Sequence, residues 1–350
     1  MSGLGSLRRS FLLSAVGAWA LPGTTLSATD FVRSEPRINH RVSIALAAPL
    51  SLHHLPLTLA DRLGFFRQAG IAVEWLPQGS DVQALASAMQ GQAQVVSGAF
   101  EHLFGLQQKG MSCQAFVQMG RTPQLSFGVS SRLNVRSVMA LKGAKIGVSA
   151  LQSSSHFMAC HWLMQNGLLP EDVVFVEVGS SLGVVDALRA GAVDAVCNLD
   201  PIMFGLEHRN EIRLLGEART LLSSRKLLGG AVPGACLWAR SDYLQKQPEL
   251  VQALSDAVVH GLKWLQTAGL TDILKTVPAS HWEADRTIYL GAFEKLRESY
   301  ALDGVFAPEA VANAWHAYNR LPDRHVGSRP VLASTYTNSF AMKSKIRFEA

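Results

Sequence analysis

Two stretches of the chain repeat the same alternation of strand and helix at one offset. The segment Ile44–Ala47 aligns with Ile146–Ser149, and Ala84-Leu85 aligns with Ala187-Leu188. The offset stays close to 100 residues, and each short helix is followed by a glycine. Two copies of a βαβαβ unit in one chain predict two similar α/β lobes.

Apolar periodicity and helix-capping residues predict the individual elements. Strands are expected at 41–47, 71–76, 94–97, 112–119, 125–130, 144–149, 173–178 and 193–197. Helices are expected at 56–69, 81–90, 100–109, 154–166 and 182–190. Beyond about Gly230 the chain reads as mainly helical, with candidates at 243–267, 282–299 and 308–320.

This order predicts an α/β fold with two lobes, each a mixed, mostly parallel sheet flanked by helices, and a ligand cleft between the lobes. Lobe one is expected at 41–122 plus 228–350, and lobe two at 123–227. Ligands bind at the carboxyl ends of strands in such sheets. The loops to inspect are therefore 48–55, 78–81, 97–101, 150–156, 179–182 and 198–201.

The N-terminus has the pattern of an export signal. Arg8-Arg9 precedes Phe11, an apolar run extends from Leu12 to Leu21, and no acidic residue occurs before Asp30. We therefore expect residues 1–28 to be a signal peptide and the protein to be periplasmic. The arginine pair favours the twin-arginine route, and the Sec route stays open. Cleavage after Ala20 or after Ala28 is compatible with the sequence.

Composition excludes several classes of protein. The chain is 48% hydrophobic and 17% charged, which is enough for a packed core. No apolar run reaches the ~18 residues of a spanning helix, so we expect no integral membrane protein. A net charge of +5 spread along the chain does not indicate nucleic-acid binding.

The four cysteines, Cys113, Cys160, Cys197 and Cys236, lie in apolar segments without zinc-like spacing. They predict buried thiols rather than a metal site, and no cofactor is expected.

One candidate binding segment begins the helix expected at 154–166. Ser153, Ser154, Ser155 and His156 bring hydroxyl and imidazole donors to a helix start, where backbone N–H groups favour an anion. Ordinary capping by Ser153 or Ser154 is the alternative.

Other candidates follow neighbouring strands. Gly98, after Ser97, would let the backbone approach a ligand, and Phe100, before Glu101, could stack on a ligand or pack inside. Arg121 could clamp an acidic group or lie exposed on the surface. Asp200 could contact a ligand or cap a helix.

We find no GxSxG, GxGxxG, Walker A or HExxH motif, so no catalytic residue is assigned and no enzyme is expected.

The assembled motifs resemble the periplasmic binding proteins of ABC importers for nitrate, aliphatic sulfonates and thiamine-pyrimidine precursors. The resemblance runs from about Ile44 to Ala341. The segments that carry it are 63–66, 70–74, 84–97, 141–148, 153–156, 191–195, 200–201 and 336–340.

The resemblance implies a type II binding protein that closes about a hinge and has no catalytic turnover. It would capture a small organic anion or heterocycle and deliver it, as a monomer, to an ABC permease and its ATPase. The family often has glycine where this chain has Gln152, so Gln152 could itself reach the ligand. The pyrimidine-making enzymes of the superfamily use a cysteine-rich motif that is absent here. A periplasmic ligand sensor and a secreted α/β hydrolase are the alternative functions.

Overall fold

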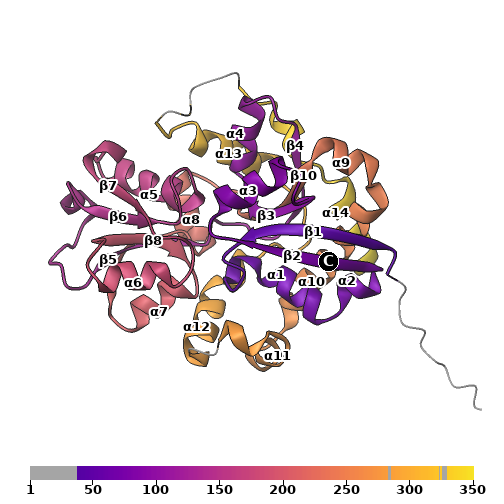
Figure 1. Ribbon diagram of the computed structural model, residues 1–350, viewed down its shortest axis with the longest axis horizontal. Coiled ribbons are helices and arrows are strands. Elements are labelled where there is room, and N and C mark those ends of the chain that lie inside the picture. Colours follow the sequence, from indigo (N-terminus) through magenta and orange to yellow (C-terminus); the bar gives the residue numbers. More distant parts are fainter. Residues whose placement is uncertain (1–37, 283–284, 323, 325–328) are drawn as a thin grey trace, which may run out of the picture. The chain divides into compact units, whose positions relative to one another are not determined.

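Two five-stranded sheets organise residues 38–350 in the computed structural model (Figure 1). The structure describes this range except 283–284, 323 and 325–328, so the expected signal peptide lies outside the described residues. Both sheets are mixed, mostly parallel and flanked by helices, which confirms the predicted fold class.

The first sheet has the strand order β2-β1-β3-β10-β4. Strand β1 is parallel to β2 and β3, whereas β10 is antiparallel to β3 and β4. The strands are β1 (His40–Ala47), β2 (Ile71–Gln78), β3 (Val95–Ala99), β4 (Cys113–Gln118) and β10 (Ala235–Arg240). The helices between them are α1 (Leu55–Arg62), α2 (Phe65–Gln68), α3 (Asp81–Met89) and α4 (His102–Gln108). We call this sheet with its helices the first lobe.

The second sheet repeats that topology in the order β7-β6-β8-β5-β9. Its strands are β5 (Leu125–Ser130), β6 (Lys145–Val148), β7 (Val174–Glu177), β8 (Ala195–Leu199) and β9 (Ile212–Glu217). The helices are α5 (Ser154–Gln165), α6 (Gly183–Arg189), α7 (Ile202–His208) and α8 (Leu221–Leu228). This sheet with its helices is the second lobe. The repeat holds in the register, because Ile44 pairs with Val95 in the first sheet and Ile146 with Ala195 in the second.

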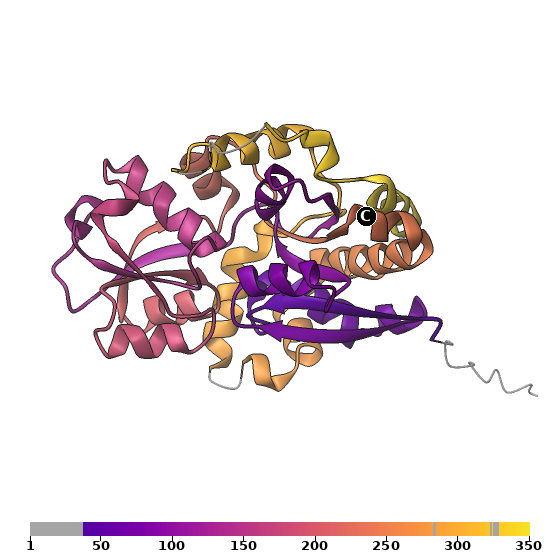
Figure 2. The same ribbon diagram turned by 45° about the horizontal axis from the view of Figure 1, so that its top comes forward.

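The C-terminal helices extend the first lobe and reach the second. They are α9 (Ser241–Lys246), α10 (Pro248–Thr267), α11 (Leu270–Thr276), α12 (Arg286–Leu296), α13 (Pro308–Tyr318) and α14 (Ser339–Phe348). Helix α10 packs on α1, α2 and α14, whereas α12 packs against α7 of the second lobe (Figure 2). This chain segment therefore joins both sheets.

Two crossings connect the lobes and lie side by side. One runs from β4 to β5, and the other follows α8 into β10. The amide of Gly234 donates to the carbonyl of Gly120 at 2.9 Å, which pairs the crossings. The lobe boundaries at 122/123 and 227/228 stay a prediction.

Several expected elements differ from the observed ones. The single helix expected at 56–69 is two helices, because Gly64 has a φ of +75° and breaks the helix there. The helix expected at 243–267 is divided before Pro248, which lacks the amide hydrogen that a helix interior needs.

Strand β10 lies where mainly helix was expected. Its inner residues are buried on both faces, so no apolar alternation marks it as a strand. Strand β9 and helices α7, α8 and α14 were not predicted either.

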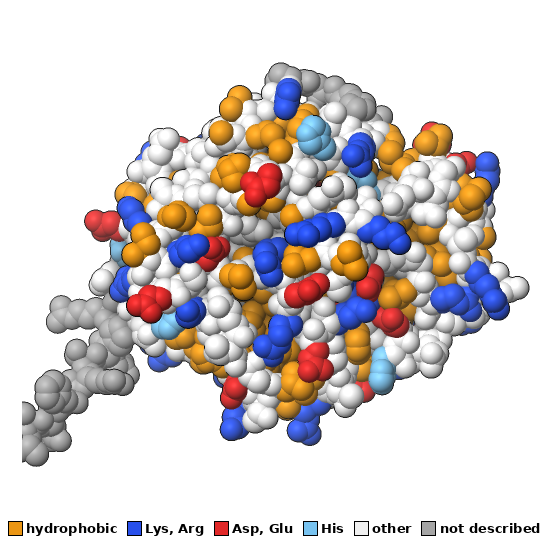
Figure 3. Space-filling view, turned by 180° about the vertical axis from the view of Figure 1, so that it is seen from behind, with side chains coloured by type: hydrophobic (Ala, Val, Ile, Leu, Met, Phe, Trp, Pro, Cys, Tyr) orange, Lys and Arg blue, Asp and Glu red, His pale blue; other side chains and the backbone are white. Residues whose placement is uncertain are grey.

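The surface carries charges of both signs. On the face seen in Figure 3, Lys and Arg side chains are interspersed with Asp and Glu. No helix within the described ranges is both long and apolar enough to cross a bilayer.

Candidate functional site

A cavity opens where the carboxyl ends of the two sheets face each other. Its volume is about 40 Å³. Each of the six loops that follow strands contributes at least one lining residue. The lining residues are Ala47, His53, His54, Asp81, Ser97, Ala99, Pro123, Leu125, Ser149, Ser154, Ser155, Ser180, Asn198 and Leu199.

Hydrogen bonds of His54 determine which way the Ser97 hydroxyl points. His54 Nε2 lies 2.7 Å from the Ala47 carbonyl, and Nδ1 lies 2.8 Å from Ser97 Oγ. A carbonyl only accepts, so Nε2 carries the proton. Burial lowers the pKa of His54 to about 3, and the ring is neutral at pH 7. Ser97 therefore donates to Nδ1 and offers its oxygen lone pairs to the cavity.

His53 brings an unsatisfied group to the same wall. Its side chain is 6% exposed, and Nδ1 has no hydrogen-bond partner among the described residues. Burial lowers the pKa of His53 to about 4, so this ring too is neutral at pH 7. A buried polar atom without a partner is costly, which marks His53 as a group that a ligand could satisfy.

Asp81, at the start of α3, connects the lobes. Its Oδ2 accepts from His102 Nε2 and from the backbone amide of Ser154, each at 2.9 Å. Burial alone would raise the pKa of Asp81, but the charge of His102 and these hydrogen bonds outweigh it and lower that pKa. Asp81 is therefore ionised, and it occupies an amide at the start of the second-lobe helix α5.

Ser153, Ser154 and Ser155 lie together at the start of α5. The Ser153 side chain caps the helix by accepting from the His156 amide at 3.2 Å. Ser155 Oγ accepts from the Ser149 amide at 2.8 Å and lies 2.9 Å from Ser153 Oγ. Ser154 and Ser155 line the cavity, whereas the completely buried Ser153 supports them from behind.

His156 turns back onto its own loop. The Gln152 amide donates to its Nδ1 at 3.1 Å, and its ring meets Phe175 edge-on at 4.4 Å between centroids. Burial lowers the pKa of His156 to about 4. Gln152 has a φ of +64°, a conformation that glycine adopts without strain. Neither side chain lines the cavity.

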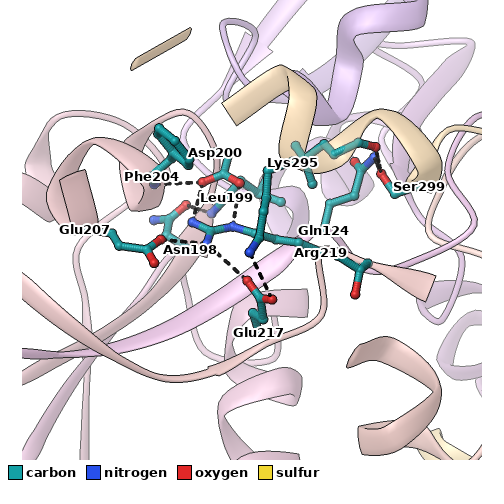
Figure 4. A network of polar contacts seen from close by, with 12 residues as sticks. Gln124, Asn198, Leu199, Asp200, Phe204, Glu207, Glu217, Arg219, Lys295 and Ser299 are labelled. Atoms are coloured by element: carbon teal, nitrogen blue, oxygen red, sulfur yellow. Dashed lines mark hydrogen bonds and ion pairs between the residues drawn. The ribbon is translucent and has the colours of Figure 1, made fainter. Parts of the chain in front are cut away.

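Asp200 is committed to a buried ion pair (Figure 4). Its carboxylate binds the Arg219 guanidinium through two hydrogen bonds, of 2.7 and 2.9 Å, and caps α7 through the Phe204 amide. Arg219 is completely buried and also binds Glu207 at 2.8 Å. Burial alone would lower the pKa of Arg219, but the two acids outweigh it and raise that pKa. Asp200 does not line the cavity.

The remaining candidate residues also lie outside the cavity lining. Arg121 donates to the carbonyls of Tyr300 and Glu298, at 3.0 and 2.7 Å. Phe100 is completely buried and packs against Phe104 and Phe306. The other two are Gly98, which lies inside β3, and Glu101, which lines a separate cavity beside α13.

The described residues hold no cluster of three metal-ligating side chains. All four cysteines are buried free thiols, and burial raises their pKa values.

Among curated proteins, none matches the chain. A family model described as NMT1/THI5 like matches residues 51–268, which is more than half of the chain. The chain belongs to the NMT1/THI5-like family.

Solved structures share the fold of this NMT1/THI5-like protein. A protein of Bordetella bronchiseptica RB50 is 35% identical, with a TM-score of 0.84 over 89% of this chain and 98% of that chain. The alkanesulfonate-binding protein SsuA from Xanthomonas axonopodis pv. citri, solved bound to MOPS, is 18% identical (TM-score 0.69; 85% and 98% of the two chains). The periplasmic nitrate-binding protein NrtA from Synechocystis PCC 6803 is 12% identical (TM-score 0.68; 88% and 89%).

These structures confirm the predicted resemblance to periplasmic binding proteins. The fold also occurs in an enzyme, the desulfurization enzyme DszB, at 17% identity (TM-score 0.61; 88% of this chain and 99% of that chain).

Sequence reasoning about this NMT1/THI5-like protein identified the right loops but not every lining residue. The candidates did not include the lining residues His53, His54, Asp81, Ser180 and Asn198. All five lie at the carboxyl end of a strand or shortly after it, and that position was the available signal. Their partners, by contrast, come from distant parts of the chain.

Proposed function

We propose that this protein is a periplasmic solute-binding protein that captures a small polar organic molecule between its lobes and delivers it to an ABC permease. The observation that carries the proposal is the cavity lined by loops from both sheets. A ligand held there contacts both lobes at once, so its binding energy favours the closed arrangement. The fold of the alkanesulfonate- and nitrate-binding proteins supports this assignment.

The proposed ligand contacts are Ser97, Ser154, Ser155 and His53. The two lobes already meet around them. Ser180 Oγ donates to the Gly79 carbonyl at 3.0 Å, and the Leu52 amide donates to the Asp200 carbonyl at 3.0 Å. Such contacts let a small ligand complete an interface that is mostly formed, which reduces the cost of ordering it.

Thermal shift across a panel of small anions, amides, amines and heterocycles tests the proposal. A ligand at 100 times its Kd stabilises the native state by about 2.7 kcal/mol. Ser180→Phe, which fills the cavity, should abolish the shift. Ser181→Phe, at the exposed neighbouring position, should leave it intact. Equal shifts for both variants would place the ligand outside the cleft.

Delivery to a permease has its own measurement. Cells that carry Ser180→Phe should take up the stabilising ligand more slowly than cells with Ser181→Phe. Equal uptake, together with ligand binding by the purified protein, would favour the alternative of a sensor.

One observation favours hydrolysis as a second candidate. Ser97 Oγ and His54 Nδ1 are 2.8 Å apart, within reach of a nucleophile and its base. A base works best with a pKa near the operating pH, whereas burial lowers the pKa of His54 to about 3. His54 is therefore a poor proton acceptor, and we favour capture over turnover. Conversion of the stabilising ligand by the purified protein, abolished in Ser97→Ala, would reverse this preference.

A further inference from the structure

We propose that Asp81 is a specificity-determining residue that makes the cleft select neutral or cationic ligands with N–H donors and reject anions. The inference rests on the proposed function, because it names the ligand class of the same cleft. It departs from the expectation of an anion at the start of the helix expected at 154–166.

One of the amides at the start of α5 that could meet an anion is already occupied. Asp81 Oδ2, from the first lobe, lies 2.9 Å from the Ser154 amide in the second lobe. The next capped amide of that turn, His156, binds Ser153 Oγ. A carboxylate of the chain itself therefore stands where the oxygen of an anionic ligand would lie.

The lining contains no compensating positive charge. Among the described residues that line the cavity there is no Lys or Arg, and Asp81 is the acidic one. The nearby Arg219 is held by Asp200, and Arg121 is held by backbone carbonyls.

The histidine partner of Asp81 does not face the ligand. His102 binds the same carboxylate oxygen, Oδ2, and is absent from the cavity lining. An anion in the cavity would therefore meet Asp81 before His102. Two negative charges in close contact repel each other strongly where water is scarce.

Two groups of the wall are free to accept a hydrogen bond, beside the hydroxyls of Ser154 and Ser155, which can also donate. Asp81 Oδ1 accepts only the amide of Val82, at 3.1 Å, and keeps capacity for another donor. The Ser97 hydroxyl donates its hydrogen to His54 and presents its oxygen lone pairs to the cavity. The Asn198 side chain accepts from the Leu199 amide and donates to the Gly179 carbonyl. A ligand with N–H donors matches these two acceptors.

Three probes of nearly one shape separate charge from size: benzamidine, benzamide and benzoate. Their binding is measured by calorimetry on the purified wild-type protein, on Asp81→Ala and Asp81→Asn, and on the control Asp186→Asn. Asp186 is an exposed acid of α6, so its variant removes the same charge away from the cleft. Asp81→Asn keeps an acceptor for the Ser154 amide and guards against a folding defect in Asp81→Ala.

We expect the wild type and Asp186→Asn to bind benzamidine or benzamide at least tenfold more tightly than benzoate. Both Asp81 variants should gain at least tenfold in benzoate affinity over the wild type. The inference is overturned if both Asp81 variants bind benzoate no more tightly than the wild type does.

The outcomes separate this inference from the proposed function. If the wild type binds benzoate in the cleft as tightly as benzamidine and benzamide, ligand capture stands and the role of Asp81 falls. If only the Asp81 variants bind a probe, and no molecule of the wider panel stabilises the wild type, the role of Asp81 stands and ligand capture falls.

Discussion

The direction of single hydrogen bonds determines what the cleft offers a ligand. His54 is buried and neutral, with its proton on Nε2, so its other nitrogen takes the Ser97 proton. A hydroxyl that could either donate or accept thus becomes an acceptor. Asp81 is restricted in the same way, because its Oδ2 already accepts from His102 and from the Ser154 amide. Residues outside the ligand's reach therefore set its required chemistry.

Ser97→Ala should weaken both the ligand complex and the free protein. The change removes a ligand acceptor and leaves His54 Nδ1 buried without a donor, which costs about 1–3 kcal/mol of unfolding free energy. Ser126→Ala is the matched control, because the buried Ser126 hydroxyl has no partner among the described residues. Urea denaturation should show a loss for Ser97→Ala and little change for Ser126→Ala. The reverse ranking would contradict the proposed hydrogen bond.

The buried imidazoles of His53 and His54 should make the protein less stable as the pH falls. The pKa values of His53 and His54 are lowered to about 4 and 3, so the unfolded chain binds their protons first. The contribution of these two neutral rings to the free energy of unfolding is fully present above about pH 6.5 and is lost as the pH falls towards 4. At pH 5 each ring costs about 2 kcal/mol, at 1.36 kcal/mol per unit.

His102 acts in the opposite direction, because Asp81 raises its pKa against the effect of burial. The contribution of His102 to the free energy of unfolding is fully present below about pH 6.5 and is lost at higher pH. Urea denaturation at pH 7 and pH 5 measures the balance. His54→Gln should reduce the loss between these two values, and an unchanged loss would exclude His54 as a cause.

At the scale of elements, the two crossings, where we expect the hinge, touch through their backbones. A Cβ atom on Gly234 would lie 1.9 Å from the carbonyl oxygen of Thr122, so no side chain fits between the crossings. The same crossing region holds Arg121, whose side chain binds the C-terminal segment at Tyr300 and Glu298. The crossings are thus packed elements, and their spacing affects how the lobes meet.

Gly234→Ala should be strongly destabilising or should separate the crossings. The overlap with Thr122 requires a backbone shift, and we expect a loss above about 3 kcal/mol. Gly143→Ala is the control, because Gly143 has a φ of +80° but open space around it. That change should cost only about 1 kcal/mol of backbone strain. Thermal unfolding compares the two, and equal losses would argue against a tight hinge.

At the scale of the whole body from residue 38 onward, a charge network around the buried Arg219–Asp200 pair joins the second lobe to the C-terminal helices. Arg219 binds Asp200 and Glu207, and Glu217 binds Lys295 of α12 at 3.4 Å (Figure 4). The Leu221 amide donates to Glu298 at 2.9 Å. Since α12 follows the first-lobe helices in the chain, this network helps set the relative position of the lobes.

Arg219→Met should destabilise the protein by about 3–5 kcal/mol, because it leaves the buried Asp200 carboxyl, whose pKa burial already raises, without its charged partner. Asp200→Asn on the same background should recover part of the loss, since the amide oxygen can still cap the Phe204 amide. Urea denaturation of both variants checks this. A double variant no more stable than Arg219→Met would show that the unpaired charge is not the cause.

Local sequence determined the two-sheet fold and the loops that line the cleft. Strand alternation, helix caps and the repeat are properties of short segments, and the carboxyl end of a strand is a binding position wherever that strand lies. The buried strand β10 was not predicted, because its sequence has no alternation of apolar and polar residues. The orientation of His156, the pairing of Asp200 with Arg219 and the contact of Asp81 with Ser154 were decided only by tertiary structure. Each depends on which side chains distant segments bring together, and the Asp81 contact spans 73 residues between separate lobes. Such a contact leaves no periodic mark in the sequence, because packing between lobes selects it.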